Sequence, residues 1–240
     1  MKTRILSMIC LLMIVSFLST SGFSVNKLAP NETSAVNHSF SSDESELVGG
    51  LKEALLLGTK TAVQLVSQED GYFENEIIKI LMPEDLQKVT DTLSRIGLQQ
   101  QVDEFVLSMN RAAEKAGPGA IDIFVEAIKA MTFEDATGIL TGGDTAATDY
   151  FKEKTSGQIY ETFKPIISTS MSEVGVTQAY KQLTDKYASL PLMSAVAFDI
   201  DDYVTNKALD GLFYMVGEEE KKIRTDPAAR ATDLLKRIFK

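Results

Sequence analysis

Two groups of aspartates are the residues of this chain whose type and spacing could do chemistry. The first follows a glycine pair in TGGDTAATDYF, where Asp144, Thr145 and Asp149 supply carboxylate and hydroxyl oxygens. The second lies in FDIDDY, where Asp201 and Asp202 are adjacent. Calcium and magnesium ions bind oxygen ligands, so the two groups would suit a hard divalent cation if the fold brought them into one cleft.

Helix capping explains the first aspartate group without a ligand. An aspartate just before a helix accepts hydrogen bonds from free backbone amides and complements the positive end of the helix. Asp144 is therefore predicted to bind the amide of Ala146 or Ala147, after the flexible glycine pair. A carboxylate at this position would repel a phosphate group, so we do not expect an anion site here.

The second aspartate group has a similar explanation. Asp199 is predicted to cap a helix, with Asp202 as its reciprocal partner and Phe198 packed on Tyr203 as a hydrophobic staple. No EF-hand spacing occurs in the sequence. We favour capping in both groups and expect no cofactor, with calcium or magnesium as the alternative.

A third polar cluster lies in SMNRAAEKAG, on a helix otherwise rich in alanine. Asn110, Arg111 and Glu114 fall near one side of this helix, and the three-residue step favours an internal ion pair of Arg111 with Glu114. If Arg111 instead faces a cleft, it is the best group in the chain to bind a carboxylate or phosphate. The charges of GEEEKKIR, with Glu220 four residues before Arg224, indicate a solvated helix face.

Residue types that the chain lacks exclude much chemistry. The only cysteine is Cys10 and the only histidine is His38, and both lie before residue 47. Zinc sites built from Cys and His, thiol nucleophiles, disulfides and Ser-His-Asp relays are therefore excluded from the rest of the chain. What remains for an enzyme is carboxylate or metal-assisted hydrolysis by Asp144, Asp149, Asp201 and Asp202, with Arg111 orienting the substrate.

The N-terminal segment has the pattern of a secretory signal peptide. Lys2 and Arg4 precede an apolar run at residues 5–18, which is shorter than the roughly 20 residues of a membrane-spanning helix. Cleavage after Gly22 or Ser24 would fit. Cys10 lies too far inside the apolar run for lipid attachment, so we expect export to the periplasm with no stable membrane anchor after cleavage.

Residues 25–46 are rich in serine and asparagine and are predicted to form a disordered linker before a domain at residues 47–240. The chain is acidic, with a net charge of −10, and removing Lys2 and Arg4 with the signal peptide makes it more so. Such a chain repels phosphate backbones, so we expect no nucleic-acid partner.

Apolar residues recur at three- and four-residue steps through the domain, which predicts an all-α bundle of about nine helices. Pro83 suits a first helical position, Gly97 a helix end, and Thr132 an N-cap. Pro165 is expected to kink or split the longest helix. The expected helices cover residues 47–65, 83–97, 102–116, 123–131, 132–140, 144–174 and 179–187, with two more starting near Asp199 and Asp226.

Two apolar segments lack helical spacing. They are residues 77–82 (IIKILM) and residues 190–198 (LPLMSAVAF). We expect both to be buried over the bundle, where they could pair as a minimal two-stranded β ribbon. If they are exposed instead, they indicate contact with a partner or with lipid.

Six motifs, in this order, resemble a known family: LKEALLLGT, MPEDLQKV, SMNRAAEKA, GGDTAATDYF, FDIDDYVTNKALDGLF and DPAARATDLLKRIF. The chain is similar, over residues 47–239, to the bacterial exported family called domain of unknown function 4197. The resemblance implies a mostly helical fold in the envelope of Gram-negative bacteria, and it carries no established activity or catalytic residues. Some members look like lipoproteins, which the position of Cys10 does not fit.

Taken together, these observations favour a non-catalytic protein of the cell envelope that binds a small ligand or an envelope protein. The alternative is the carboxylate-based or metal-assisted hydrolase, acting on an envelope substrate. The alternative requires the two aspartate groups to meet in one cleft, and the candidate ligand-binding residues are those of all three polar clusters: Asn110, Arg111, Glu114, Asp144, Thr145, Asp149, Asp201 and Asp202.

Overall fold

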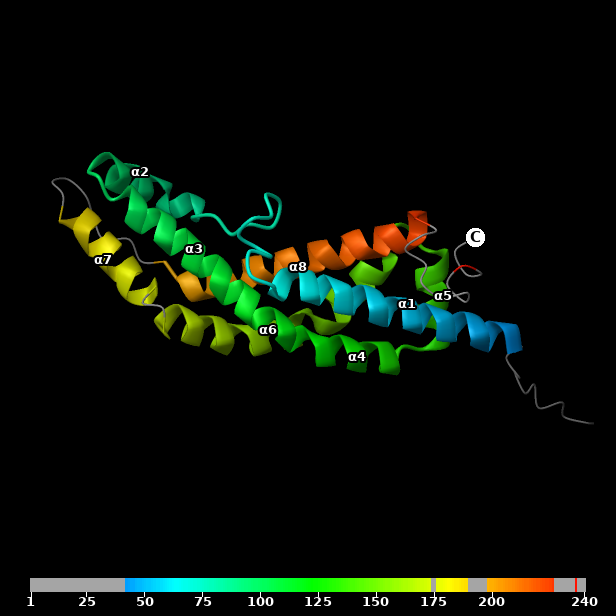
Figure 1. Cartoon of the computed structure of the whole chain (residues 1–240). Helices are drawn as coiled ribbons and strands as arrows, with labels where there is room; N and C mark the ends of the chain where they lie inside the picture. Colours follow the sequence, from blue (N-terminus) through cyan, green and yellow to red (C-terminus); the bar gives the residue numbers. More distant parts are fainter. Residues whose placement is uncertain (1–41, 174–175, 190–197, 227–235, 237–240) are drawn as a thin grey trace, which may run out of the picture. The chain divides into compact units, whose positions relative to one another are not determined.

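The computed structural model describes residues 42–173, 176–189, 198–226 and 236, which all belong to the compact unit Phe40–Lys240. Helices make up the regular structure, and no strand occurs among these residues, so the predicted all-α class is confirmed. In chain order the elements are α1 (Ser42–Ser67), the 3-10 turn η1 (Glu84–Leu86), α2 (Gln87–Arg95), α3 (Gln99–Ala116), the 3-10 turn η2 (Gly117–Gly119), α4 (Ala120–Ala130), α5 (Phe133–Thr141), α6 (Ala146–Glu173), α7 (Val176–Ala188) and α8 (Ile200–Thr225) (Figure 1).

The long helices α1, α6 and α8 form the centre of the domain. Helix α8 packs along both α1 and α6, while α3 packs against α6 and α4 against α1 and α6 (Figure 1). Helices α6 and α8 run antiparallel, because the start of α6 contacts Glu220 near the end of α8 and Ser168 near the end of α6 contacts Asp201. This pairing fixes which side chains of the two helices can meet.

Aromatic rings from three helices fill the core. Phe124 of α4 meets Phe151 of α6 at a centroid distance of 5.1 Å and Phe213 of α8 at 6.2 Å, both edge to face. All three side chains are buried. Burying a side chain of this size stabilises the fold by about 1.5–3 kcal/mol, so this cluster is one of the main reasons why these helices stay together.

The predicted helix boundaries are confirmed where the signals are local. Thr132 caps α5, since its hydroxyl accepts from the amide of Asp135 at 3.1 Å and the Asp135 carboxylate accepts from the Thr132 amide at 2.9 Å. Helix α5 ends at Gly142, and Gly97 follows α2 with a φ of 87°. Pro83 precedes the turn η1 rather than entering α2.

Two boundaries differ from the prediction. Helix α1 begins at Ser42, so the end of the predicted linker is helical. Its sequence there, SDESE, is rich in acidic residues, which are favoured in a first helical turn. Helix α6 passes through Pro165 without being divided. Burial of Phe163 and Ile167 on either side of the proline offsets the loss of one backbone hydrogen bond.

Residues 77–82 form no strand, and 190–197, the other half of the predicted ribbon, lie outside the described residues. Residues 77–82 were expected to be buried, and only some of them are. Ile78 and Ile80 are buried, at 6% and 1% exposure, whereas Ile77 and Leu81 are 67% and 57% exposed. The segment therefore buries two isoleucines and exposes two other large apolar side chains.

The ninth predicted helix falls on residues that the structure does not describe. Asp226, its expected cap, follows the end of α8, and its amide donates to the carbonyl of Lys222 at 2.8 Å. None of the helices that are described combines the length and the apolar character needed to cross a membrane.

Candidate functional site

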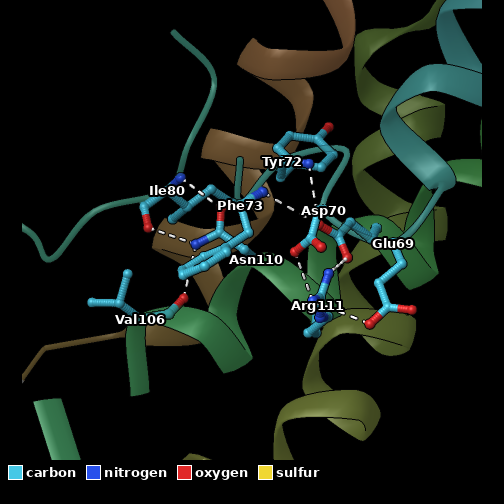
Figure 2. A network of polar contacts seen from close by, with 9 residues as sticks. Glu69, Asp70, Tyr72, Phe73, Ile80, Val106, Asn110 and Arg111 are labelled. Atoms are coloured by element: carbon cyan, nitrogen blue, oxygen red, sulfur yellow. Dashed lines mark hydrogen bonds and ion pairs between the residues drawn. The ribbon is translucent and has the colours of Figure 1, made fainter. Parts of the chain in front are cut away.

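Arg111 of α3 lies at the centre of a charged network that holds the turn after α1 (Figure 2). Its guanidinium donates to Glu114 and to Asp70, each at 2.7 Å, and Glu69 lies 3.4 Å away. These contacts, led by that with Glu114, raise the pKa of Arg111 above its ordinary value. The predicted pair of Arg111 with Glu114 is confirmed, and Arg111 serves the fold.

The other carboxylate oxygen of Glu114 binds the backbone of the turn. Oε1 of Glu114 accepts from the amides of Tyr72 and Phe73, at 3.1 and 3.3 Å. The phenol of Tyr72 donates to the carbonyl of Ala208 in α8 at 2.6 Å. Burial, and then the nearby Glu114 charge, raises the pKa of Tyr72 above its usual range, so the phenol stays neutral. The turn is thereby fixed to both α3 and α8.

Asn110, next to Arg111, holds the segment that follows the turn (Figure 2). Its Oδ1 accepts from the amide of Ile80 and its Nδ2 donates to the carbonyl of the same residue, both at 2.8 Å. A third bond runs from Nδ2 to the carbonyl of Val106 at 2.8 Å. The side chain is completely buried and makes the two bonds that a neighbouring β-strand would make.

An open groove of about 700 Å³ lies between residues 77–87 and the part of α8 from Tyr203 to Tyr214. Ile77, Leu81 and Tyr214 stand at this groove with exposures of 67%, 57% and 37%. The two walls approach closely at Gly211, where a Cβ atom would lie 3.1 Å from Cβ of Ile78 and 2.5 Å from Cε1 of Tyr72 in the preceding turn. Glycine at this position therefore lets α8 lie against the segment.

The charges at the groove are balanced. Lys79 and Lys207 line it together with Glu84 and Asp210. The ammonium of Lys79 lies 3.8 Å from the centre of the Phe73 ring, and Lys207 lies 3.5 Å from Asp210. In a chain with a net charge of −10 this neutral, partly apolar surface is distinct from the acidic average.

Asp144, Thr145 and Asp149 lie exposed at the start of α6. The Thr145 hydroxyl donates to Asp149 at 3.0 Å. The predicted capping by Asp144 is wrong. The amide of Ala146 donates to a backbone carbonyl, that of Gly143, at 3.2 Å.

Glu220 of α8 caps α6 instead. Its two carboxylate oxygens accept from the amides of Ala147 and Thr148, at 2.9 and 2.8 Å. Glu220 also accepts from Arg224 at 2.8 Å, and these side chains are only 6% and 12% exposed. The predicted solvated face is therefore wrong at this pair, because the start of α6 covers it.

Asp199 caps α8 as predicted, accepting from the amide of Asp202 at 2.9 Å, and the rings of Phe198 and Tyr203 lie 5.7 Å apart. The carboxylate of Asp202 does not complete the predicted capping box. It accepts from the phenol of Tyr160 in α6, and the ammonium of Lys164 lies 3.4 Å away. The bond from Tyr160 is the main reason why the pKa of Asp202 is lowered.

The two aspartate groups do not meet. Asp201 accepts from Ser168 at 2.7 Å near the end of α6, whereas Asp149 lies near its start. At about 1.5 Å per residue, the helix between Asp149 and Ser168 is roughly 28 Å long. In the described part of the chain, no group of three or more His, Cys, Asp or Glu side chains is placed to hold a metal ion. The convergence that the hydrolase requires is not found.

Sequence reasoning missed two parts of this arrangement. Glu220 and Arg224 carry the pattern of an exposed ion pair, and nothing in their spacing shows that the end of another helix covers them. The exposed edge formed by Ile77 and Leu81 did have a signal, because the apolar run IIKILM is interrupted only by Lys79 and so leaves apolar residues on both sides of an extended chain.

The structure is a helical domain with an open, partly apolar groove. The chain belongs to the family described as Protein of unknown function (DUF4197), whose sequence profile matches residues 41–240. The resemblance seen in the motifs is thereby confirmed, over nearly the same residues. No curated protein and no solved structure is significantly similar to the chain.

Proposed function

We propose that this protein is a non-catalytic binding protein of the bacterial cell envelope, and that the groove between residues 77–87 and α8 receives a small ligand or a protein partner. The observation that carries the proposal is the group of exposed apolar side chains at the groove, Ile77, Leu81 and Tyr214. Large apolar side chains gathered on one surface commonly serve binding.

The groove wall is rigidly held, which favours binding. Asn110 fixes Ile80, Glu114 fixes the amides of Tyr72 and Phe73, and Tyr203 donates to the carbonyl of Leu81 at 3.0 Å. A surface that is already ordered loses little conformational entropy when a ligand binds. The hydrolase alternative has weaker support, because its carboxylates lie at opposite ends of α6.

A dye titration tests the binding surface. An environment-sensitive apolar dye such as bis-ANS is titrated into the protein and into the Leu81→Ser variant. We expect roughly fivefold to tenfold weaker binding of the dye to this variant, because a large apolar contact is lost. The control is Leu57→Ser on α1, where the leucine is 40% exposed and away from the groove lining. Equal dye affinity in all three proteins would contradict a groove site.

Export is the second part of the proposal, and it is supported by the basic and apolar pattern of residues 1–24. The full-length chain is expressed in a Gram-negative host and recovered from the periplasmic fraction. Intact mass spectrometry is expected to show a chain that begins at Phe23 or Val25. A chain that keeps Met1 and stays in the cytoplasm contradicts export without affecting the groove.

A further inference from the structure

Residues 79–82, which follow a turn at residues 76–78, form a short extended segment that has no neighbouring strand among the described residues. Ile80 is buried and Leu81 is exposed, as expected on the two sides of an extended chain. Ile77 and Ile78 precede it in a turn that the amide of Lys79 closes by donating to the carbonyl of Asn75 at 2.9 Å. On one edge the side chain of Asn110 forms hydrogen bonds with both the amide and the carbonyl of Ile80, at 2.8 Å. One edge of the segment is therefore satisfied by a single side chain instead of a strand.

The opposite edge faces the groove. In an extended chain the backbone groups of successive residues point to opposite edges, so those of Leu81 and the carbonyl of Lys79 point away from Asn110. The amide of Lys79 donates to the carbonyl of Asn75 in the preceding turn. The carbonyl of Leu81 accepts from the phenol of Tyr203, and Tyr203 lines the groove. Within the described residues, no group pairs with the amide of Leu81 or with the carbonyl of Lys79.

We propose that the groove binds an extended peptide segment, which adds as a strand to this free edge. The inference rests on the proposed function of the groove and specifies its ligand class. A peptide carbonyl would accept from the Leu81 amide, and a peptide amide would donate to the Lys79 carbonyl. The peptide side chains on one face would lie along Ile77 and Leu81, and those on the other face would lie over Tyr214 and the adjoining part of α8.

Two further features support a peptide over a small apolar molecule. Unpaired backbone groups are matched by another backbone, whereas an apolar molecule would bury them without hydrogen bonds at a cost in free energy. Lys79 at the start of the segment is the kind of residue that limits uncontrolled pairing of an exposed strand edge. Its ammonium is held over Phe73, at 3.8 Å from the ring centre, so it leaves the edge accessible.

Charge restricts the peptide further. The lysines Lys79 and Lys207 balance Glu84 and Asp210 at the groove, so the groove offers no net charge to a ligand. The net charge of −10 on the chain repels an acidic segment at long range. The groove therefore complements an uncharged segment in which apolar residues alternate with small polar ones.

The probe for the test is a fluorescent, capped octapeptide of alternating threonine and valine, titrated into the full exported chain and followed by fluorescence anisotropy. Two substitutions separate backbone pairing from side-chain contact. Leu81→Pro removes the amide proton, whereas Leu81→Val keeps it and loses a similar amount of side chain. We expect the proline variant to bind roughly fivefold to tenfold more weakly than the valine variant, the usual effect of one lost hydrogen bond.

A backbone measurement on the unmodified protein accompanies the variants, in case Leu81→Pro fails to fold. Hydrogen exchange of the Leu81 amide is expected to slow at least about tenfold when the peptide is present. The same peptide with every amide N-methylated is expected not to bind, because it cannot donate to the Lys79 carbonyl.

Four outcomes overturn strand addition: no binding of the octapeptide, equal affinity of the proline and valine variants, binding of the N-methylated peptide, or an unchanged Leu81 exchange rate with peptide bound. Each of these leaves the groove intact as a binding site if Leu81→Ser still weakens dye binding. Loss of the dye effect itself contradicts the proposed function, so the two failures are distinguishable.

Discussion

At the scale of single residues, three buried polar side chains each bind the backbone of another segment. Glu114 binds the amides of the turn after α1, Asn110 binds Ile80, and Glu220 binds the first amides of α6. Buried polar groups are tolerated when they are hydrogen-bonded. These three side chains therefore specify where the irregular segment after α1 and the start of α6 lie.

Asn110→Asp tests whether the hydrogen bonds of the buried Asn110 side chain stabilise the fold. The substitution replaces the amide donor to Ile80 and Val106 by a second acceptor oxygen and buries a charge. We expect the free energy of unfolding to fall by roughly 2–4 kcal/mol, measured by urea denaturation. Gln101→Glu makes the same amide-to-carboxylate exchange at an exposed position of α3 and is expected to change it by less than about 0.5 kcal/mol. Equal effects would mean that the Asn110 bonds do not stabilise the fold.

Glu220→Gln and Asp144→Ala separate two possible caps of α6. The glutamine retains only one acceptor oxygen for the amides of Ala147 and Thr148 and loses the ion pair with Arg224. We expect a loss of roughly 3–5 kcal/mol in the free energy of unfolding for Glu220→Gln, and less than about 0.5 kcal/mol for Asp144→Ala. Thermal and urea unfolding measure both, and a larger effect at Asp144 would restore the capping that the sequence suggested.

At the scale of elements, α8 connects the groove with the rest of the domain. Its start is capped by Asp199, its middle carries Tyr203 and Gly211 at the groove, and its end holds α6 through Glu220. Because the side chains along one helix keep fixed relative positions, α8 sets the position of the groove wall relative to the start of α6.

Gly211→Ala tests the close approach of α8 to the turn. The added methyl group would lie 2.5 Å from Tyr72 and 3.1 Å from Ile78, so these neighbours must move. We expect a loss of about 1–3 kcal/mol in the free energy of unfolding and weaker dye binding. Gly157→Ala in α6 has nothing within 4 Å of the new atom and is expected to stabilise the protein by about 0.5–1 kcal/mol. A stabilising effect at both positions would refute the close approach.

At the scale of the whole molecule, ionisable groups from several helices predict the dependence of stability on pH. The carboxyl groups of Asp135 and Asp202 have pKa values below the ordinary 3.8, mainly because of bonds from Thr132 and Tyr160. The phenol of Tyr72 has a pKa above the ordinary 10.0 because it is buried. The two kinds of group act on opposite limbs of the pH profile.

Between pH 3.8 and pH 10.0 these contributions are fully present. Below pH 3.8, Asp135 and Asp202 bind protons more readily in the unfolded chain than in the folded protein, so the free energy of unfolding falls as the pH falls. Above pH 10.0, Tyr72 ionises more readily in the unfolded chain, so the free energy of unfolding falls as the pH rises. Urea unfolding across pH is measured for the protein, for Asp202→Asn and for Tyr72→Phe. The difference between protein and variant should shrink below pH 3.8 for the first and above pH 10.0 for the second. A stability difference that grows in either of these pH ranges would contradict the direction of the pKa shifts.

Local sequence was enough for much of this protein. The all-α class, the capping box of Thr132 with Asp135, the cap by Asp199 and the pair of Arg111 with Glu114 follow from residues three or four positions apart, and the structure has all of them. Such contacts form on one helix or one helix end, so the partner is set by the helical repeat.

Only the tertiary structure determines the contacts that form the groove. It also determines that the two aspartate groups lie apart, whereas the hydrolase requires them in one cleft. Glu220 binds an amide 73 positions away, Asn110 binds Ile80 across 30 positions, and Asp202 binds Tyr160 across 42. Many side chains of the same type compete for such partners, and only the packing of α3, α6 and α8 brings these pairs together. The sequence therefore determined which side chains could hold a helix end or an irregular segment, and the packing of the helices determined which of them do.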